Sequence, residues 1–195
     1  MAGGRAVSVE QPVTRLRIDH WDRPVDQHDA AILSRCVGPT LDVGCGPGRF
    51  TAGLAERGHV VLGIDVVPSA VSSTRDRGGA ALRRDVFGDL PGEGRWGTAL
   101  LADGNLGIGG DPVALLGRLR TLLDPRGRVV AEVAEPGTEA VRDYAAVEHG
   151  GATQVVPWAV VGMDGIDAIV DRAGFAVVDR LECCSRWCVV LAAAA

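Results

Sequence analysis

The residues with the clearest chemical meaning form a glycine-rich segment, Asp42-Val43-Gly44-Cys45-Gly46-Pro47-Gly48. Glycine lets a backbone turn sharply and lets a ligand approach where a Cβ atom would collide. A second carboxylate, Asp65, ends the next apolar run about 20 residues after Gly44, where an acidic residue accepts hydrogen bonds from a ribose. Together these signals predict a nucleoside-containing cofactor lying across the ends of parallel strands.

The spacing of the glycines indicates which cofactor fits. A dinucleotide fingerprint reads Gly-x-Gly-x-x-Gly, whereas here the third glycine, Gly48, comes one residue early. Pro47 removes a backbone N–H that a pyrophosphate would need, and Asp42 adds a charge that repels it. S-adenosyl-L-methionine carries a sulfonium and an ammonium, and both positive groups suit a nearby carboxylate. It also has a ribose, whose hydroxyls Asp65 could bind. The alternative is a glycine-rich turn in a Rossmann-like domain without this cofactor.

The segment resembles the cofactor-binding motif of the class I S-adenosylmethionine-dependent methyltransferases, in which Asp-x-Gly-x-Gly-x-Gly occupies the first strand–helix turn. The resemblance covers residues 25–133 closely and 164–191 in outline. It implies a Rossmann-like α/β fold with a seven-stranded, mostly parallel sheet, one antiparallel strand near the C-terminus and helices on both faces. It also implies S-adenosyl-L-methionine as cofactor and S-adenosyl-L-homocysteine as product. We expect a single domain over residues 1–195.

The cofactor cradle is expected at the carboxyl ends of the strands, where ligands bind in such sheets. The resemblance places Asp85 at the adenine amino group, Val86 beside the ring and Asn105 near the methyl group. Ordinary loop packing for Val86 and an ordinary turn for Asn105 stay open as alternatives. The expected cofactor-binding residues are Asp42, Gly44, Cys45, Gly46, Gly48, Asp65, Val66, Asp85, Val86, Asp103, Gly104, Asn105, Trp21 and Arg23.

Residues 1–24 are expected to form an N-terminal lid or a mobile segment. Many small-molecule methyltransferases fold this region over the cofactor, so the resemblance suggests that Trp21 shields the sulfonium and that Arg23 binds a carboxylate. The alternative is a hydrophobic plug at Trp21 with exposed charges beside it.

The loop after the predicted fourth strand reads Asp103-Gly104-Asn105-Leu106-Gly107-Ile108-Gly109-Gly110. Family members that methylate planar nitrogens often carry Pro-Pro and an aromatic residue here, and this chain has neither. The departure argues against methylation of a nucleobase or of a glutamine amide. We expect the glycines to keep the loop low and open for a bulkier substrate.

Catalysis of methyl transfer requires an acceptor held about 3–3.5 Å from the methyl carbon, exclusion of water, and a base where the acceptor carries a proton. His20 and His149 lie in segments able to reach the pocket, and Glu135 could orient an acceptor hydroxyl or amine. Residues 134–163 form a longer connection than the sheet requires, so we expect a substrate-side insertion. Within it, 138–149 is expected to be partly helical and 150–162 an edge hairpin or lid.

Composition bounds the class of protein. The chain has 195 residues, of which 47% are hydrophobic, enough for one globular core. A net charge of -5 gives nucleic acid no long-range attraction, and no apolar run is long enough to span a membrane. Five cysteines without an export signal indicate reduced thiols in a cytoplasm. Their spacing does not suit metal ligation, so no metal site is expected.

The leading interpretation is a methyltransferase that acts on an oxygen or nitrogen of a small-molecule acceptor in secondary metabolism. It would work as a monomer or homodimer, without a nucleic-acid or membrane partner. Two alternatives remain: a non-methylating S-adenosylmethionine-binding protein on the same scaffold, and a nicotinamide-dependent dehydrogenase.

Overall fold

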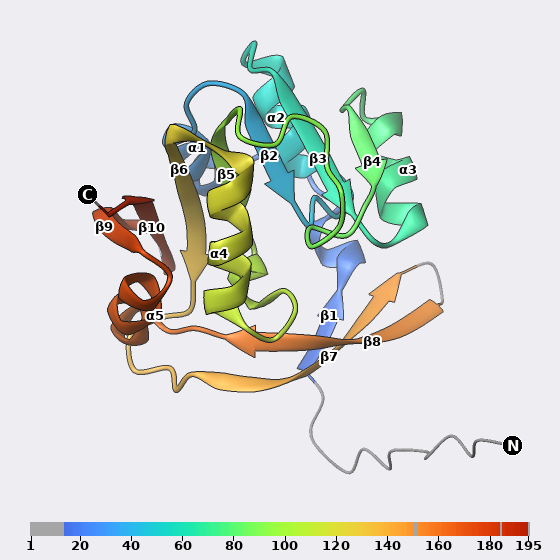
Figure 1. Ribbon diagram of the computed structural model, residues 1–195. Coiled ribbons are helices and arrows are strands. Elements are labelled where there is room, and N and C mark those ends of the chain that lie inside the picture. The colour runs from blue at the N-terminus through green and yellow to red at the C-terminus, as the bar shows by residue number, and fades with distance from the viewer. Residues whose placement is uncertain (1–13, 150–151, 184, 195) are drawn as a thin grey trace, which may run out of the picture.

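The central sheet has the strand order β4-β3-β2-β5-β6-β10-β9, and the computed structural model describes residues 14–149, 152–183 and 185–194 (Figure 1). Neighbouring strands from β4 to β6 run parallel, whereas β10 runs antiparallel to both β6 and β9. The strands are Thr40–Val43 (β2), Val61–Asp65 (β3), Ala81–Arg83 (β4), Trp96–Leu101 (β5), Leu123–Val133 (β6), Phe175–Cys183 (β9) and Arg186–Ala193 (β10). The predicted fold class is therefore confirmed, including the single reversed strand.

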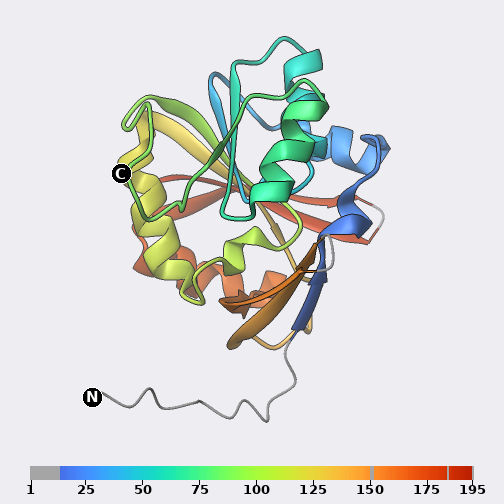
Figure 2. The same ribbon diagram turned by 90° about the vertical axis from the view of Figure 1, so that its right-hand side faces the viewer.

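Apolar side chains on both faces of this sheet hold two layers of helices. Successive strand residues point to opposite faces, so Ala99 and Leu101 join the core cluster that contains α4 and α5, and Leu100 joins the cluster that contains α1 and α2. Figure 2 shows the sheet between these layers. The helices are Gln27–Leu33 (α1), Arg49–Glu56 (α2), Pro68–Asp76 (α3), Pro112–Leu122 (α4) and Ile166–Arg172 (α5).

Local signals in the sequence determine where several helices begin. At α4, the Asp111 carboxylate accepts hydrogen bonds from the N–H groups of Val113 and Ala114, and Pro112 occupies the first turn. At α1, Asp26 and Asp29 form a reciprocal capping box. In the described part of the chain, every helix is too short or too polar to cross a lipid bilayer.

A second sheet crosses below the carboxyl ends of the central strands (Figure 1). Its strands are Thr14–Arg17 (β1), Val141–His149 (β7) and Ala152–Val160 (β8); β1 pairs parallel with β7, and β7 pairs antiparallel with β8. The expectation of partial helix over 138–149 is wrong, because pairing with two strands outweighs the helical tendency of an alanine-containing segment. The expected edge hairpin exists, but its first strand starts well before residue 150.

Candidate active site

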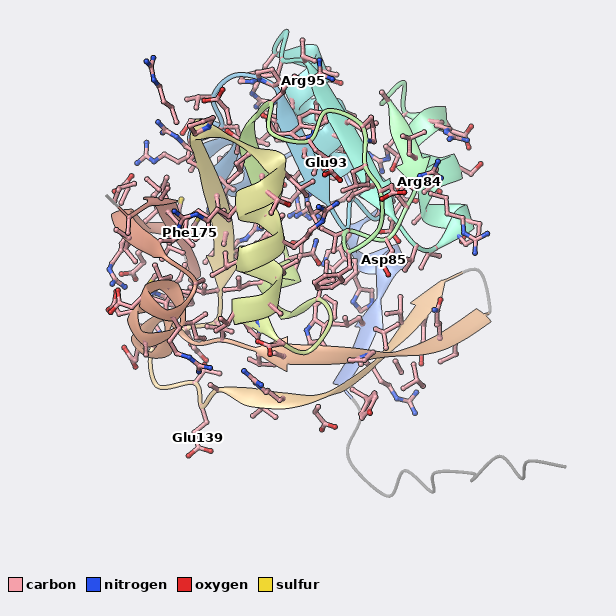
Figure 3. All side chains as sticks on the ribbon, viewed as in Figure 1. Arg84, Asp85, Glu93, Arg95, Glu139 and Phe175 are labelled. Carbon is pink, nitrogen blue, oxygen red and sulfur yellow. The ribbon has the colours of Figure 1, made fainter. Side chains whose placement is uncertain are left out.

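A cavity of about 270 Å³ lies between the carboxyl ends of β2 to β4 and the second sheet. The side of the central sheet contributes Val43, Gly44, Gly46, Ile64, Asp65, Val66, Val67, Arg84, Asp85, Val86, Phe87, Asn105, Ile108 and Gly109. The opposite side contributes Leu16 of β1, Trp21, Val147 of β7 and residues 154 and 156–158 of β8. Figure 3 labels Arg84 and Asp85 in the loop that leaves β4, above the hairpin. The cavity is therefore at the edge of the sheet where the sequence predicted the cofactor.

The three motif glycines all adopt positive φ, which glycine tolerates best: +72° at Gly44, +53° at Gly46 and +88° at Gly48. A Cβ atom at Gly44 would lie 2.8 Å from Asn105 Nδ2, and one at Gly48 would lie 2.7 Å from Thr74. A Cβ atom at Gly46 would meet no protein atom within 4 Å. Gly44 and Gly48 thus permit close packing within the protein, whereas Gly46 leaves space free beside the cavity.

Asp65 is held at the cavity by two backbone donors. The Gly46 N–H donates to Asp65 Oδ2 at 3.0 Å, and the Val67 N–H donates to Asp65 Oδ1 at 2.8 Å. These bonds orient the carboxylate, and a carboxylate oxygen can accept more than one hydrogen bond. The residue expected to bind a ribose therefore lies beside the glycine that leaves space for one.

Apolar side chains near Asp65 are exposed at the cavity. Val66 is 40% exposed and Phe87 44% exposed, although both are apolar, and Val86 is buried at the cavity lining. Asp85 lies beside them, and its Oδ1 accepts a hydrogen bond from the Phe87 N–H at 3.0 Å. A flat ring with an amino group would cover this apolar surface and reach the Asp85 carboxylate.

Asn105 joins the loop after β5 to the glycine-rich loop. It opens the short helix η2 (Asn105–Gly107), and its Nδ2 donates to the carbonyl oxygens of Val43 at 2.8 Å and Gly44 at 2.9 Å. The side chain is buried and lines the cavity. Asn105 therefore holds the backbone of the glycine-rich loop in place and also faces the cavity.

The glycines of the loop after β5 do not have the expected role. A Cβ atom at Gly107 would collide with the carbonyl oxygen of Ala159, and one at Gly110 would lie 3.2 Å from Pro157. The loop also forms a bridge between Ile108 and Trp158. The expectation that the loop glycines leave room for a bulky substrate is therefore wrong at Gly107 and Gly110, because β8 occupies that space, whereas a Cβ atom at Gly104 would meet no protein atom within 4 Å.

A small cavity of about 20 Å³ continues from the main one toward charged side chains. It shares Trp21, Gly44, Gly46 and Asn105 with the main cavity and is also lined by Cys45, Pro47, Arg49, Phe50 and Asp103. Trp21 ends the short helix η1 (Ile18–Trp21) and borders both cavities. Cys45 is buried, with its Sγ 3.5 Å from Thr74 Oγ1, in keeping with a packing role.

Behind the small cavity lies an ionic cluster that sequence reasoning missed. Arg49 is 2% exposed; its Nε lies 3.1 Å from Asp29 Oδ2, and its Nη2 donates to Asp103 Oδ1 at 2.9 Å. Arg186 donates to both oxygens of Glu132 at 2.7 Å and to Asp29 Oδ1 at 2.5 Å. One sequence signal was available, because an arginine at the start of α2 opposes the helix dipole and needs a nearby carboxylate.

Burial and charge shift the pKa values within this cluster in opposite directions. Burial opposes ionisation of Asp29, but hydrogen bonds from Arg23 and Arg186 outweigh it and hold the pKa at about 2. Burial raises the pKa of Asp103, although Arg49 opposes the shift. Asp103 also has a φ of +52°, an unfavourable angle for a residue with a side chain, and its N–H donates to Glu132 Oε2 at 2.8 Å.

Two expected cofactor contacts are corrected by the structure. Arg23 lines none of the described cavities, since its Nη1 donates to Asp29 Oδ2 at 2.7 Å; the carboxylate that it binds belongs to the protein. Asp42 is 1% exposed, lines none of these cavities and accepts a hydrogen bond from Thr51 Oγ1 at 2.6 Å. Both residues bind other side chains of the protein, Asp29 for Arg23 and Thr51 for Asp42, which the sequence alone does not show.

The buried Asp42 gives a testable pH dependence. Burial raises its pKa from 3.8 to about 7 in the folded protein. A raised carboxyl pKa makes the folded state hold a proton that the unfolded chain releases, so stability falls as pH rises from about 4 to 7. Asp42→Asn keeps an acceptor for Thr51 and removes this titration. We expect its free energy of unfolding, relative to wild type, to rise by about 4 kcal/mol between pH 4 and pH 8 in urea titrations. A difference independent of pH would contradict the assignment.

Two of the three predicted catalytic residues lie away from the described cavities. His20 and Glu135 are exposed and absent from the described cavity linings. His149 ends β7, and its side chain lies outside the described residues. Gly104 lines a third cavity, on the far side of Trp158. Within the described residues, no group of three or more histidine, cysteine or acidic side chains could hold a metal ion.

Comparison with known proteins agrees with this architecture. Residues 40–127 match the family described as a methyltransferase domain. Trans-aconitate 2-methyltransferase of Paracidovorax citrulli is 31% identical over 136 residues, which are 66% of this chain and 52% of that protein. The enzyme of the same name from Rhodococcus jostii is 39% identical over 70 residues, 35% of this chain and 28% of that protein. The chain thus spans about half the length of the first of these relatives and less of the second.

Two solved structures share the fold over most of the chain. An S-adenosylmethionine-dependent methyltransferase from Bacteroides fragilis, in complex with S-adenosyl-L-homocysteine, superposes with a TM-score of 0.71 at 20% identity, covering 88% of this chain and 78% of that one. The 1,6-didemethyltoxoflavin-N1-methyltransferase of Burkholderia thailandensis gives 0.67 at 22% identity, covering 91% and 82%.

The methyltransferase-domain match over residues 40–127 and the fold shared with these structures support the class I S-adenosylmethionine-dependent methyltransferase family that the glycine-rich motif predicts.

Proposed function

We propose that the protein transfers a methyl group from S-adenosyl-L-methionine to a small-molecule acceptor. The observation that supports this proposal most directly is the arrangement at Gly46, whose missing Cβ leaves open space beside the Asp65 carboxylate. Asp85 with exposed Val66 and Phe87 offers a matching place for an adenine ring. The solved relatives bound to S-adenosyl-L-homocysteine support this assignment.

Each cavity residue then has a defined role. The cofactor supplies an activated methyl group on a sulfonium. Asp65 accepts hydrogen bonds from the ribose hydroxyls, Asp85 accepts from the adenine amino group, and Trp21 shields the cationic end against water. Asn105 holds the carbonyls of Val43 and Gly44, which fixes the floor beneath the reacting atoms. The protein contributes mainly positioning and exclusion of water, which can lower a barrier by several kcal/mol.

The second sheet is the proposed acceptor side. Residues 134–163 supply β7 and β8, and the N-terminal segment supplies β1 and Trp21, so the predicted substrate-side insertion and the N-terminal segment both line the cavity. We propose an oxygen or nitrogen acceptor from secondary metabolism and one domain over residues 1–195. We propose a cytoplasmic location, in keeping with the free thiols of Cys36, Cys45 and Cys188.

Product analysis tests the function. The protein is incubated with methyl-labelled S-adenosyl-L-methionine and a panel of small phenols and amines. Labelled product and S-adenosyl-L-homocysteine should accumulate together. Binding of S-adenosyl-L-methionine without transfer to any acceptor would favour the non-methylating alternative, and binding of NADH in its place would favour a dehydrogenase.

Asp65→Ala tests the cofactor seat. Loss of a charged hydrogen-bond acceptor should weaken S-adenosyl-L-homocysteine binding by about 1–3 kcal/mol in calorimetry. Asp124→Ala is a matched control, because Asp124 accepts from the N–H two residues later, as Asp65 does, but lines no described cavity. Equal affinities of the two variants for S-adenosyl-L-homocysteine would show that Asp65 does not bind the ribose.

A further inference from the structure

The cavity wall opposite the proposed cofactor site is built from uncharged side chains. Leu16, Val147, Val156 and Trp158 face the cavity from the second sheet, and Ile108 faces it from the loop after β5. Gln154 supplies the one polar side chain that the described part of β7 and β8 contributes to this lining. A molecule against this wall loses water and gains apolar contacts, with Gln154 available for one or two hydrogen bonds.

The ionisable side chains of the described lining gather at the other end. They are Asp65, Arg84 and Asp85, which all follow β3 or β4 and lie beside the proposed cofactor site. The arginines next to the small cavity are already bound to carboxylates: Arg49 to Asp29 and Asp103, and Arg23 to Asp29. A carboxylate group against the second sheet would therefore be desolvated with no cationic side chain beside it in the described lining, because Arg84, the one cation of that lining, follows β4 on the cofactor side.

Trp158 separates this wall from further space. Among the described lining residues, it is the one shared by the main cavity and a third cavity of about 180 Å³, whose other walls include Leu106, Glu132 and Val161. The bridge between Trp158 and Ile108, and the close approach of β8 to Gly107, hold the tryptophan in place. The indole therefore closes the apolar wall at its inner end.

From these observations we infer that the acceptor is an uncharged, largely apolar molecule and that Trp158 limits its length. The inference rests on the proposed function, since it takes the second sheet as the acceptor side. It assigns this chain a different acceptor class from trans-aconitate, the tricarboxylate that names its curated relatives.

Calorimetry on the full chain tests the charge of the acceptor. S-adenosyl-L-homocysteine is titrated first, and a failure to bind at this step would count against the proposed function alone. 2-Naphthol, 2-naphthoate and trans-aconitate are then titrated into the loaded protein, or into the free protein if the first step fails. We expect 2-naphthol to bind more than about tenfold tighter than 2-naphthoate, and trans-aconitate not to bind. Equal or tighter binding of either anion, or no binding of 2-naphthol at millimolar concentration, would overturn the inference.

Trp158→Ala tests the length limit. The shortened side chain should connect the two cavities, so 4-phenylphenol should gain about tenfold or more in affinity relative to 2-naphthol. Trp158→Phe, which keeps an aromatic ring at the partition, is the matched control and should retain the wild-type ratio. An unchanged ratio of the two affinities in a folded Trp158→Ala protein would show that Trp158 does not limit the length of the acceptor. If thermal melting shows that this variant is unfolded, Trp158→Leu replaces it in the same comparison.

Discussion

Replacing Gly46 by valine should abolish binding of S-adenosyl-L-homocysteine. The φ of +53° at Gly46 is strained for a branched side chain, and the new Cβ would project into open space beside Asp65. No protein atom within 4 Å has to move, so the loss falls mainly on the ligand. Calorimetry should detect no binding at ligand concentrations that saturate the wild type.

Gly58→Val separates this effect from backbone strain. Gly58 also has a positive φ, +81°, and open space around its missing Cβ, but it follows α2 and lines no described cavity. Both variants should lose a comparable amount of thermal stability, whereas only Gly46→Val should lose binding. Wild-type affinity in folded Gly46→Val would refute the placement of the cofactor.

Arg186→Met should cost about 3–5 kcal/mol of unfolding free energy, because it removes the arginine partner of the nearly buried Glu132 and one of the three arginines that bind Asp29. Burial alone would lower the pKa of Arg186, but Glu132 and Asp29 raise it well above its usual range, so the guanidinium stays charged. The affected carboxylates, Asp29 and Glu132, are 0% and 12% exposed at their side chains. Urea unfolding at pH 7 gives the difference.

Arg180→Met is the control for Arg186→Met. Arg180 pairs with Asp167 at 2.5 Å, but the two side chains are 40% and 63% exposed, so solvent screens the pair. Its loss should cost less than about 1 kcal/mol. Similar losses in both variants would mean that the buried cluster contributes no more than a surface ion pair.

The conformation of the glycine-rich loop follows from the sequence because its signals are local. A buried strand, alternating glycines and an acidic residue at the end of the next strand all lie within one strand–helix–strand unit, and the structure brings Gly46 and Asp65 into contact. The same reasoning assigned Asp42 and Arg23 to the ligand, since nothing local shows that Thr51 and Asp29 bind them.

The parts that could not be predicted depend on distant partners. Arg186 and Asp29 are far apart in the sequence, yet their side chains are bonded. The segment around Tyr144 carries a pattern compatible with helix or strand, and its pairing with β1 and β8 decides the outcome. The space above Gly107 is likewise filled by a strand from a remote segment.

The turn Asn105–Ile108 contacts two walls at once. Asn105 holds the carbonyls of the glycine-rich loop, and Gly107 and Ile108 lie against β8. A displacement of the hairpin would therefore be transmitted to the glycine-rich loop through this turn. Linkage between two ligands is reciprocal. An acceptor that holds the hairpin against this turn should therefore strengthen donor binding, and the donor should strengthen acceptor binding by the same factor.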